Sequence, residues 1–161
     1  MKVFFGTSSF VKKFVEEIGS KKVDNIIQKS SEIGISIILV PEIISALNRK
    51  LRSEFITEEI YLGLKNDVIE DIEDVDIINL TPSVLKKTTE LLEENTLRSL
   101  DALHIACAIE WQAELFVSSD ERQVTAAIKS NLKVEFIEGF KLKLRMQSTR
   151  KKGVGLFLRP A

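Results

Sequence analysis

The stretch LRSLDALHIACAIEW, residues 97–111, is the part of the chain from which the fold is best predicted. A helix beginning at Ser99 would carry small and branched apolar side chains on nearly every side, and such a helix suits the interior of a fold. Asp101 lies in its first turn. A carboxylate there either offsets the helix dipole or belongs to an active site, and the helix alone leaves both interpretations open.

The composition is that of an ordinary globular protein. The 161 residues are 44% hydrophobic and 29% charged, which is enough for one domain with a sizeable core. The one cysteine, Cys107, lies in the apolar helix, so we expect a buried free thiol in a reducing compartment. The apolar run at the N-terminus is too short for a signal peptide, and no stretch is long enough for a membrane span. We therefore expect a cytoplasmic protein with no membrane partner.

Charge divides the chain into an acidic body and a basic tail. Residues 141–161 contain seven Lys and Arg and no acid, which leaves 16 of the 23 basic residues against 24 acidic ones in residues 1–140, a formal charge of −8. An acidic body does not favour binding nucleic acid by general attraction. We predict a domain over residues 1–140 and a tail over 141–161, where KLKLRM permits an edge strand and the rest has no packing pattern.

Short apolar runs alternate with segments of helical periodicity along the body. This alternation predicts an α/β fold with a parallel sheet of about five strands, flanked by helices. The first helix is expected to follow the loop Gly6-Thr7-Ser8-Ser9 and to run to Ile18, with Lys12 and Lys13 on its outer side. Pro41, Thr57 and Thr81-Pro82 each indicate the start of a later helix. The five expected strands are Lys2–Phe5, Ser36–Val40, Asp76–Leu80, Leu115–Val117 and Val134–Ile137.

Three acids fall where segments of such a fold would converge. Glu42 follows the second expected strand, Asp120 follows the fourth, and Asp101 opens the central helix. Ligands bind at the carboxyl ends of parallel strands, and clustered carboxylates repel one another unless a cation lies between them. Hard oxygen ligands suit Mg²⁺ or Mn²⁺. The alternative is that each acid only offsets a helix dipole, an effect of about 0.3–1 kcal/mol.

Other site chemistry has little support. His104 and Cys107 lie on the apolar helix, where core packing is the common role, and one of each cannot build a usual zinc site. No phosphate-binding glycine motif is present. The acidic run IEDIEDVD is typical of a solvated helix end.

Four segments resemble the PIN-domain family, in particular the small VapC-like ribonuclease toxins of prokaryotic toxin–antitoxin pairs. These segments are TSSFVKKFVEE, PEIISALNRK, SLDALHIACA and FVSSDERQVTAA, in the family's order over residues 2–137. The resemblance implies a parallel sheet flanked by helices and an acidic site that binds Mg²⁺ or Mn²⁺. It also implies hydrolysis of RNA phosphodiesters, an antitoxin partner and a homodimer.

The resemblance assigns the family's second, third and fourth acids to Glu42, Asp101 and Asp120. Ser118 matches the small hydroxyl residue that often stands two positions before the fourth acid. The family's first aspartate directly precedes a Thr/Ser pair, which here is Thr7-Ser8, and its place is taken by Gly6. Since glycine offers no ligand, we expect a ribonuclease impaired at Gly6. The alternative is an inactive module that dimerises and binds an antitoxin or RNA.

Arg49 is a candidate contact for RNA. It lies seven residues after Glu42, and so on the same face of the expected helix, where it could bind a phosphate. A surface arginine without such a role is the more common case.

Overall fold

Five parallel strands form the central sheet of the computed structural model, which describes residues 1–139 and 143–144. The order is β4-β3-β1-β5-β6, and every neighbouring pair is parallel. The strands are β1 (Lys2–Phe5), β3 (Glu32–Ser36), β4 (Asp76–Ile78), β5 (Leu115–Ser118) and β6 (Val134–Phe136). The order reverses at β1, because β3 lies on one side of it and β5 on the other. The predicted parallel sheet of about five strands is confirmed.

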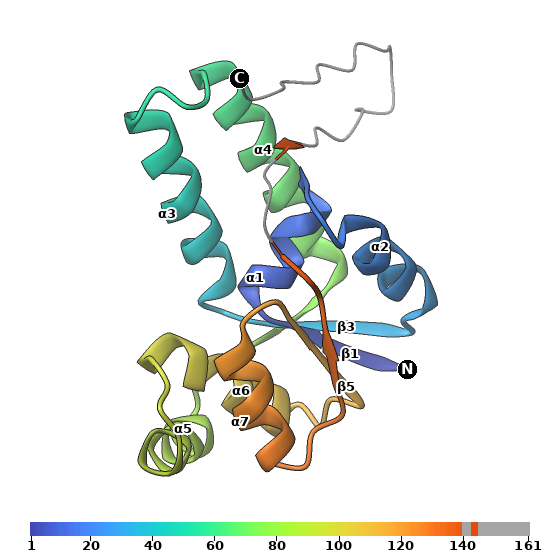
Figure 1. The fold of residues 1–161 in the computed structure, drawn as a ribbon, viewed down its shortest axis with the longest axis vertical. Helices are drawn as coiled ribbons and strands as arrows, with labels where there is room; N and C mark the ends of the chain where they lie inside the picture. Colours follow the sequence, from blue (N-terminus) through green and yellow to red (C-terminus); the bar gives the residue numbers. More distant parts are fainter. Residues whose placement is uncertain (140–142, 145–161) are drawn as a thin grey trace.

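Helices cover both faces of this sheet (Figure 1). One layer contains α1 (Thr7–Phe10), η1 (Val11–Lys13), α2 (Ser20–Lys29), α3 (Leu39–Arg52), α4 (Glu58–Asp71) and η2 (Ile72–Asp74). The other layer contains α5 (Pro82–Glu94), α6 (Ser99–Glu110) and α7 (Glu121–Lys129). Within the described ranges, no helix has the length and apolar character needed to cross a membrane.

The alternation of side chains along β1 divides the core into two clusters. Val3 and Phe5 pack with the buried residues of α1 to α4, whereas Phe4 packs with those of α5 to α7. Five residues of α6 belong to the second cluster, which agrees with the apolar helix predicted from residues 97–111; they are Ala102, Ile105, Ala106, Cys107 and Ala108. The central helix is therefore buried under the sheet, as its composition predicts.

The second strand differs from its prediction. The structure places it at Glu32–Ser36, whereas Ser36–Val40 was expected. β3 pairs with β1 in a register that joins Lys2 to Glu32 and Phe5 to Ile35, so the pairing ends where β1 ends. The apolar residues that follow begin α3 and bury Leu39 instead. Pro41 lies in the first turn of α3, where its missing N–H leaves no hydrogen bond unmade.

The helix predicted to run to Ile18 is also wrong in its length. The helical part of this segment ends with η1 at Lys13, and the strand β2 (Val15–Glu16) follows. Lys12 was expected on the outer side but is buried, with its Nζ 2.8 Å from Glu17 Oε2. Gly19, at φ 93°, provides the left-handed turn into α2.

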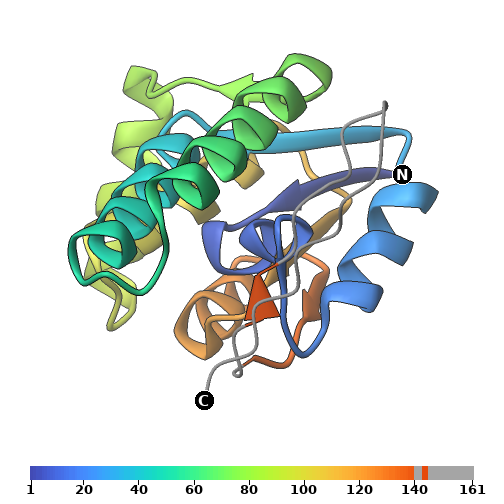
Figure 2. The same cartoon turned by 90° about the horizontal axis from the view of Figure 1, so that it is seen from above.

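The stretch KLKLRM, whose alternation permits an edge strand, contains β7 (Lys143–Leu144), which pairs antiparallel with β2. The other tail residues lie outside the described part of the chain. The other four predicted strands agree with the structure to within two residues. Figure 2 shows the same arrangement from above, with α3 and α4 side by side.

Candidate active site

The candidate site lies at the carboxyl end of β1, where the strand order reverses. The chain leaves β1 through Gly6 and enters α1 at Thr7. β3 ends on one side at Ser36 and β5 ends on the other at Ser118. A reversal of strand order opens a crevice between neighbouring loops, which is where ligands bind in open α/β sheets.

Glu42 is held on one side of this crevice by Thr7 and His104. Its Oε2 accepts a hydrogen bond from Thr7 Oγ1 and a second from His104 Nε2 at 2.7 Å. The other ring nitrogen of His104, Nδ1, lies 2.8 Å from Ser36 Oγ. Both His104 and Ser36 are buried, so the end of β3 and helix α6 together fix the ring that contacts Glu42.

These contacts decide the charge of Glu42. Burial by itself raises the pKa of the carboxyl, but the hydrogen bonds from His104 and Thr7, together with the charge of His104, outweigh burial and bring the pKa below its ordinary value. Glu42 is therefore ionised at neutral pH. A carboxylate of lowered pKa is a weak base, so the present contacts do not tune Glu42 for general-base catalysis.

Asp101 lies in the first turn of α6. Its Oδ1 accepts a hydrogen bond from Gln123 Nε2 at 2.8 Å. Its Oδ2 is buried and has no hydrogen-bond partner among the described residues. One carboxylate oxygen in the interior thus remains available to a ligand or a cation.

Asp120 is the N-cap residue of α7. Its Oδ1 accepts hydrogen bonds from the backbone N–H groups of Arg122 at 2.8 Å and Gln123 at 3.3 Å. Its own N–H donates to Ser118 Oγ at 3.0 Å. The helix-end interpretation therefore describes the side chain of Asp120 in this structure, and Ser118 positions its backbone.

The backbone at Gly6 accepts any residue. Its φ of −76° and ψ of 157° are extended. A Cβ at this position would lie 2.8 Å from Gln123 Oε1 and 3.6 Å from Ser118 Oγ. The nearer atom is the end of a flexible side chain, so an aspartate at residue 6 requires only that Gln123 moves.

The residues present do not fit a metal centre of three or more protein ligands. Within residues 1–139 and 143–144, no group of three His, Cys, Asp or Glu side chains lies close enough to hold a cation. Glu42 and Asp101 each bind a neutral or cationic protein donor, and Asp120 caps a helix.

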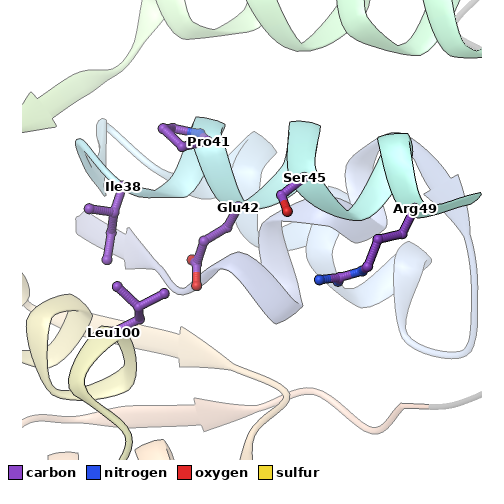
Figure 3. A pocket seen from close by; sticks show the side chains of 6 residues that line it. All are labelled: Ile38, Pro41, Glu42, Ser45, Arg49 and Leu100. Carbon is purple, nitrogen blue, oxygen red and sulfur yellow. The ribbon is translucent and has the colours of Figure 1, made fainter.

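A groove lies beside Glu42 (Figure 3). Its volume is about 380 Å³, and its lining residues come from α3, the turn before it and α6; they are Ile38, Pro41, Glu42, Ser45, Arg49 and Leu100. Glu42, Ser45 and Arg49 project from the same side of α3, and Leu100 faces Glu42 across the groove (Figure 3). The predicted common face of Glu42 and Arg49 is confirmed.

Two members of the site were not predicted as such. The sequence predicts core packing for His104 and no role for Gln123. The spacing contained a signal for each, because His104 lies one turn after Asp101 and Gln123 stands three residues after Asp120, as in a capping box. Gln123 instead turns inward to Asp101 and Ser118, which only the packing of α7 against α6 could show.

Comparison with known families identifies the fold. The PIN domain model matches residues 3–129, which is most of the chain. The chain belongs to the PIN-domain family. The resemblance found in the four sequence segments is thereby confirmed. A search of curated proteins finds no match.

Solved structures of similar shape include several toxin–antitoxin proteins. VapBC2 from Rickettsia felis, bound to a DNA fragment from its promoter, has a TM-score of 0.62 at 17% identity over 86% of this chain and 100% of that chain. DNA-bound VapBC from Salmonella typhimurium has a TM-score of 0.61 at 14% identity, and the match covers 84% of this chain and 98% of that chain. VapC20 from Mycobacterium tuberculosis, a sarcin–ricin loop cleaving toxin, has a TM-score of 0.60 at 15% identity. The match covers 77% of this chain and 94% of that chain. Identities this low establish a shared PIN fold and nothing finer.

Proposed function

We propose that this chain is a PIN-type endoribonuclease of the toxin–antitoxin kind whose cleavage of RNA is impaired by Gly6. The observation that carries the proposal is that one neighbouring side chain links the position of Gly6 to each of two acids from different helices. Its neighbour Thr7 contacts Glu42, and the space beside it is lined by Gln123, which binds Asp101. An acid at residue 6 would complete a cluster of carboxylates at the carboxyl end of β1.

Dependence on Mg²⁺ or Mn²⁺ is proposed for the chain that carries this acid. Oxygen donors suit these cations, and Asp101 Oδ2 is a buried carboxylate oxygen without a protein partner among the described residues. An aspartate at residue 6 would add a second carboxylate beside Asp101. Two such groups this close repel each other unless a cation lies between them.

Arg49 and the groove support RNA as the substrate. An exposed guanidinium on the side of α3 that carries Glu42 is suited to a phosphate of an RNA backbone. This local cation matters because residues 1–140 are acidic overall. By resemblance, the proposed partners are an antitoxin protein and a second copy of the chain.

The test is to restore the acid with Gly6→Asp. The purified wild type and variant are incubated with a 5′-labelled single-stranded RNA in Mg²⁺, in Mn²⁺ or in a chelator. We expect the variant to cleave at least about 100-fold faster than the wild type, only with metal, since one group that acts in catalysis contributes a factor of about 10²–10⁴. Gly6→Asn is the matched control, because it has the same shape without the charge. Equal inactivity of all three proteins would count against a ribonuclease.

The second candidate is an inactive PIN module that dimerises and binds an antitoxin or RNA. The observation in its favour is that Glu42 and Asp101 already have hydrogen-bond donors within the protein. Light scattering would measure the oligomeric state of the wild type, and fluorescence anisotropy would measure its binding of labelled RNA. Binding of RNA together with inactivity of Gly6→Asp would favour this candidate over the ribonuclease.

A further inference from the structure

The side chain of Gln123 fills the space beside Gly6. Gln123 is 4% exposed, and it reaches from α7 toward the end of β1. A Cβ at Gly6 would lie 2.8 Å from its Oε1, closer than a real Cβ approaches a neighbouring atom. A side chain at residue 6 and the present position of Gln123 are therefore mutually exclusive.

The side chain of Gln123 belongs to a series of hydrogen bonds that runs from Ser119 to Asp101. The N–H of Ser119 donates to Ser8 Oγ at 3.0 Å, and Ser118 Oγ donates to Gln123 Oε1 at 2.8 Å. Because the one hydroxyl proton of Ser118 is used there, the hydroxyl of Ser8 is the donor in its 3.3 Å contact with Ser118. Gln123 Nε2 then donates to Asp101 Oδ1 at 2.8 Å. Each bond polarises the next, and the series ends on a carboxylate.

An amide suits this position in a way that a carboxylate does not. Gln123 accepts from Ser118 with its oxygen and donates to Asp101 with its nitrogen. An ionised carboxylate offers acceptors only, so one placed beside Asp101 would repel it unless a cation or a proton lay between them. The amide and a cation are thus two alternative partners for Oδ1 of Asp101.

We propose that Gln123 is a positioning residue that holds Asp101 in place of a cation, so that the site of this chain is a metal-independent hydrogen-bond network. Gly6 and Gln123 are coupled, because the glycine leaves the space that the amide occupies. The proposal concerns the packing of the site, and it stands whether or not the chain cleaves RNA.

The main test is Gln123→Glu, which keeps the size of the side chain and replaces the donor to Asp101 by an acceptor. In chelator, the melting temperature should fall by about 3–10 °C, which is the effect expected when a buried carboxylate loses its partner in a domain of this size. Mn²⁺ at about 100 times its Kd should raise it again by about 5–10 °C. The wild type should melt at the same temperature in Mn²⁺ and in chelator.

Gln123→Met is the matched control. It has a similar volume but neither hydrogen bond nor ligand, so its melting temperature should fall and Mn²⁺ should not restore it. A merely structural glutamine would give the same response to Mn²⁺ in the glutamate and methionine variants. That result, or stabilisation of the wild type by Mn²⁺ as large as that of Gln123→Glu, would overturn the proposal.

A second measurement tests the coupling if Gln123→Glu does not fold. Gly6→Ala should lower the melting temperature of the wild type, because the new methyl group meets the amide, and should have less effect in a Gln123→Ala background. If Gly6→Ala lowers the melting temperature equally in the two backgrounds, the claim that residue 6 and Gln123 share one space is refuted. None of these readouts involves RNA, so their failure is distinguishable from failure of the proposed ribonuclease, which depends on cleavage by Gly6→Asp.

Discussion

Replacing His104 by leucine should destabilise the protein by about 2–4 kcal/mol. The substitution places an apolar side chain at this position of α6 and removes both ring nitrogens. Glu42 loses a charge-assisted hydrogen bond, an effect of about 1.5–3 kcal/mol, and the fully buried hydroxyl of Ser36 loses its partner, which costs about 1–3 kcal/mol. The sum is reduced because the side chain of Glu42 is 26% exposed, so water replaces part of the lost bond, and because Thr7 still donates to it.

Urea unfolding followed by circular dichroism at pH 7 measures this loss, which corresponds to a fall in melting temperature of about 5–15 °C. The control is Ser36→Ala. It should cost about 1 kcal/mol in the wild type, where it leaves His104 Nδ1 without its partner, and close to nothing in the His104→Leu background. The reasoning is refuted if His104→Leu changes stability by less than about 0.5 kcal/mol, or if Ser36→Ala costs the same in both backgrounds.

Two further predictions concern titratable groups. Because the pKa of Glu42 lies below its ordinary value of 4.5 in the folded protein, its ionised form stabilises the fold above that pH, and this contribution is lost as the pH falls through the lowered pKa. Glu42→Gln should therefore flatten the decline of the urea midpoint below about pH 5, and an unchanged decline would contradict the assignment. Burial, with a smaller contribution from the charge of Glu110, raises the pKa of Cys107 to about 12. The folded protein should therefore react with a thiol reagent at pH 7.5 at least about 100-fold more slowly than the unfolded chain, and rapid labelling of the native protein would show that the thiol is accessible.

The layered fold was predictable because its signals are local. Each strand of the central sheet except β3 matched a predicted short apolar run, and Thr57 and Thr81 cap the helices that they were expected to begin. The errors came where neighbours overrode local pattern. The apolar residues after Ser36 favoured a longer strand, but β1 ends at Phe5 and offers no further partner. Lys12 matched an exposed helical position, yet its pairing with Glu17 allows it to be buried.

The site was predictable in its residues more than in its contacts. Strand ends and helix starts predicted that Glu42, Asp101 and Asp120 would lie at the carboxyl ends of the strands, but among the described residues no three His, Cys, Asp or Glu side chains lie close enough together to hold a cation. Which of them binds which partner depends on side chains that meet across 22 to 62 residues of sequence, such as Gln123 with Asp101 and His104 with Glu42. Such pairings have no local signature, so the roles of His104 and Gln123 could not be derived before α6 and α7 were in place.

The central helix α6 shows most clearly what the local sequence determines and what depends on the tertiary structure. Residues 97–111 by themselves determined a buried helix with a carboxylate in its first turn, because periodicity and apolar content depend only on the local chain. Only the tertiary structure decided what that carboxylate does. Gly6 leaves a space at the end of β1, the packing of α7 places the amide of Gln123 in it, and Asp101 binds that amide. A missing side chain on one element changed the partner of an acid on another, and such an effect exists only where the elements touch.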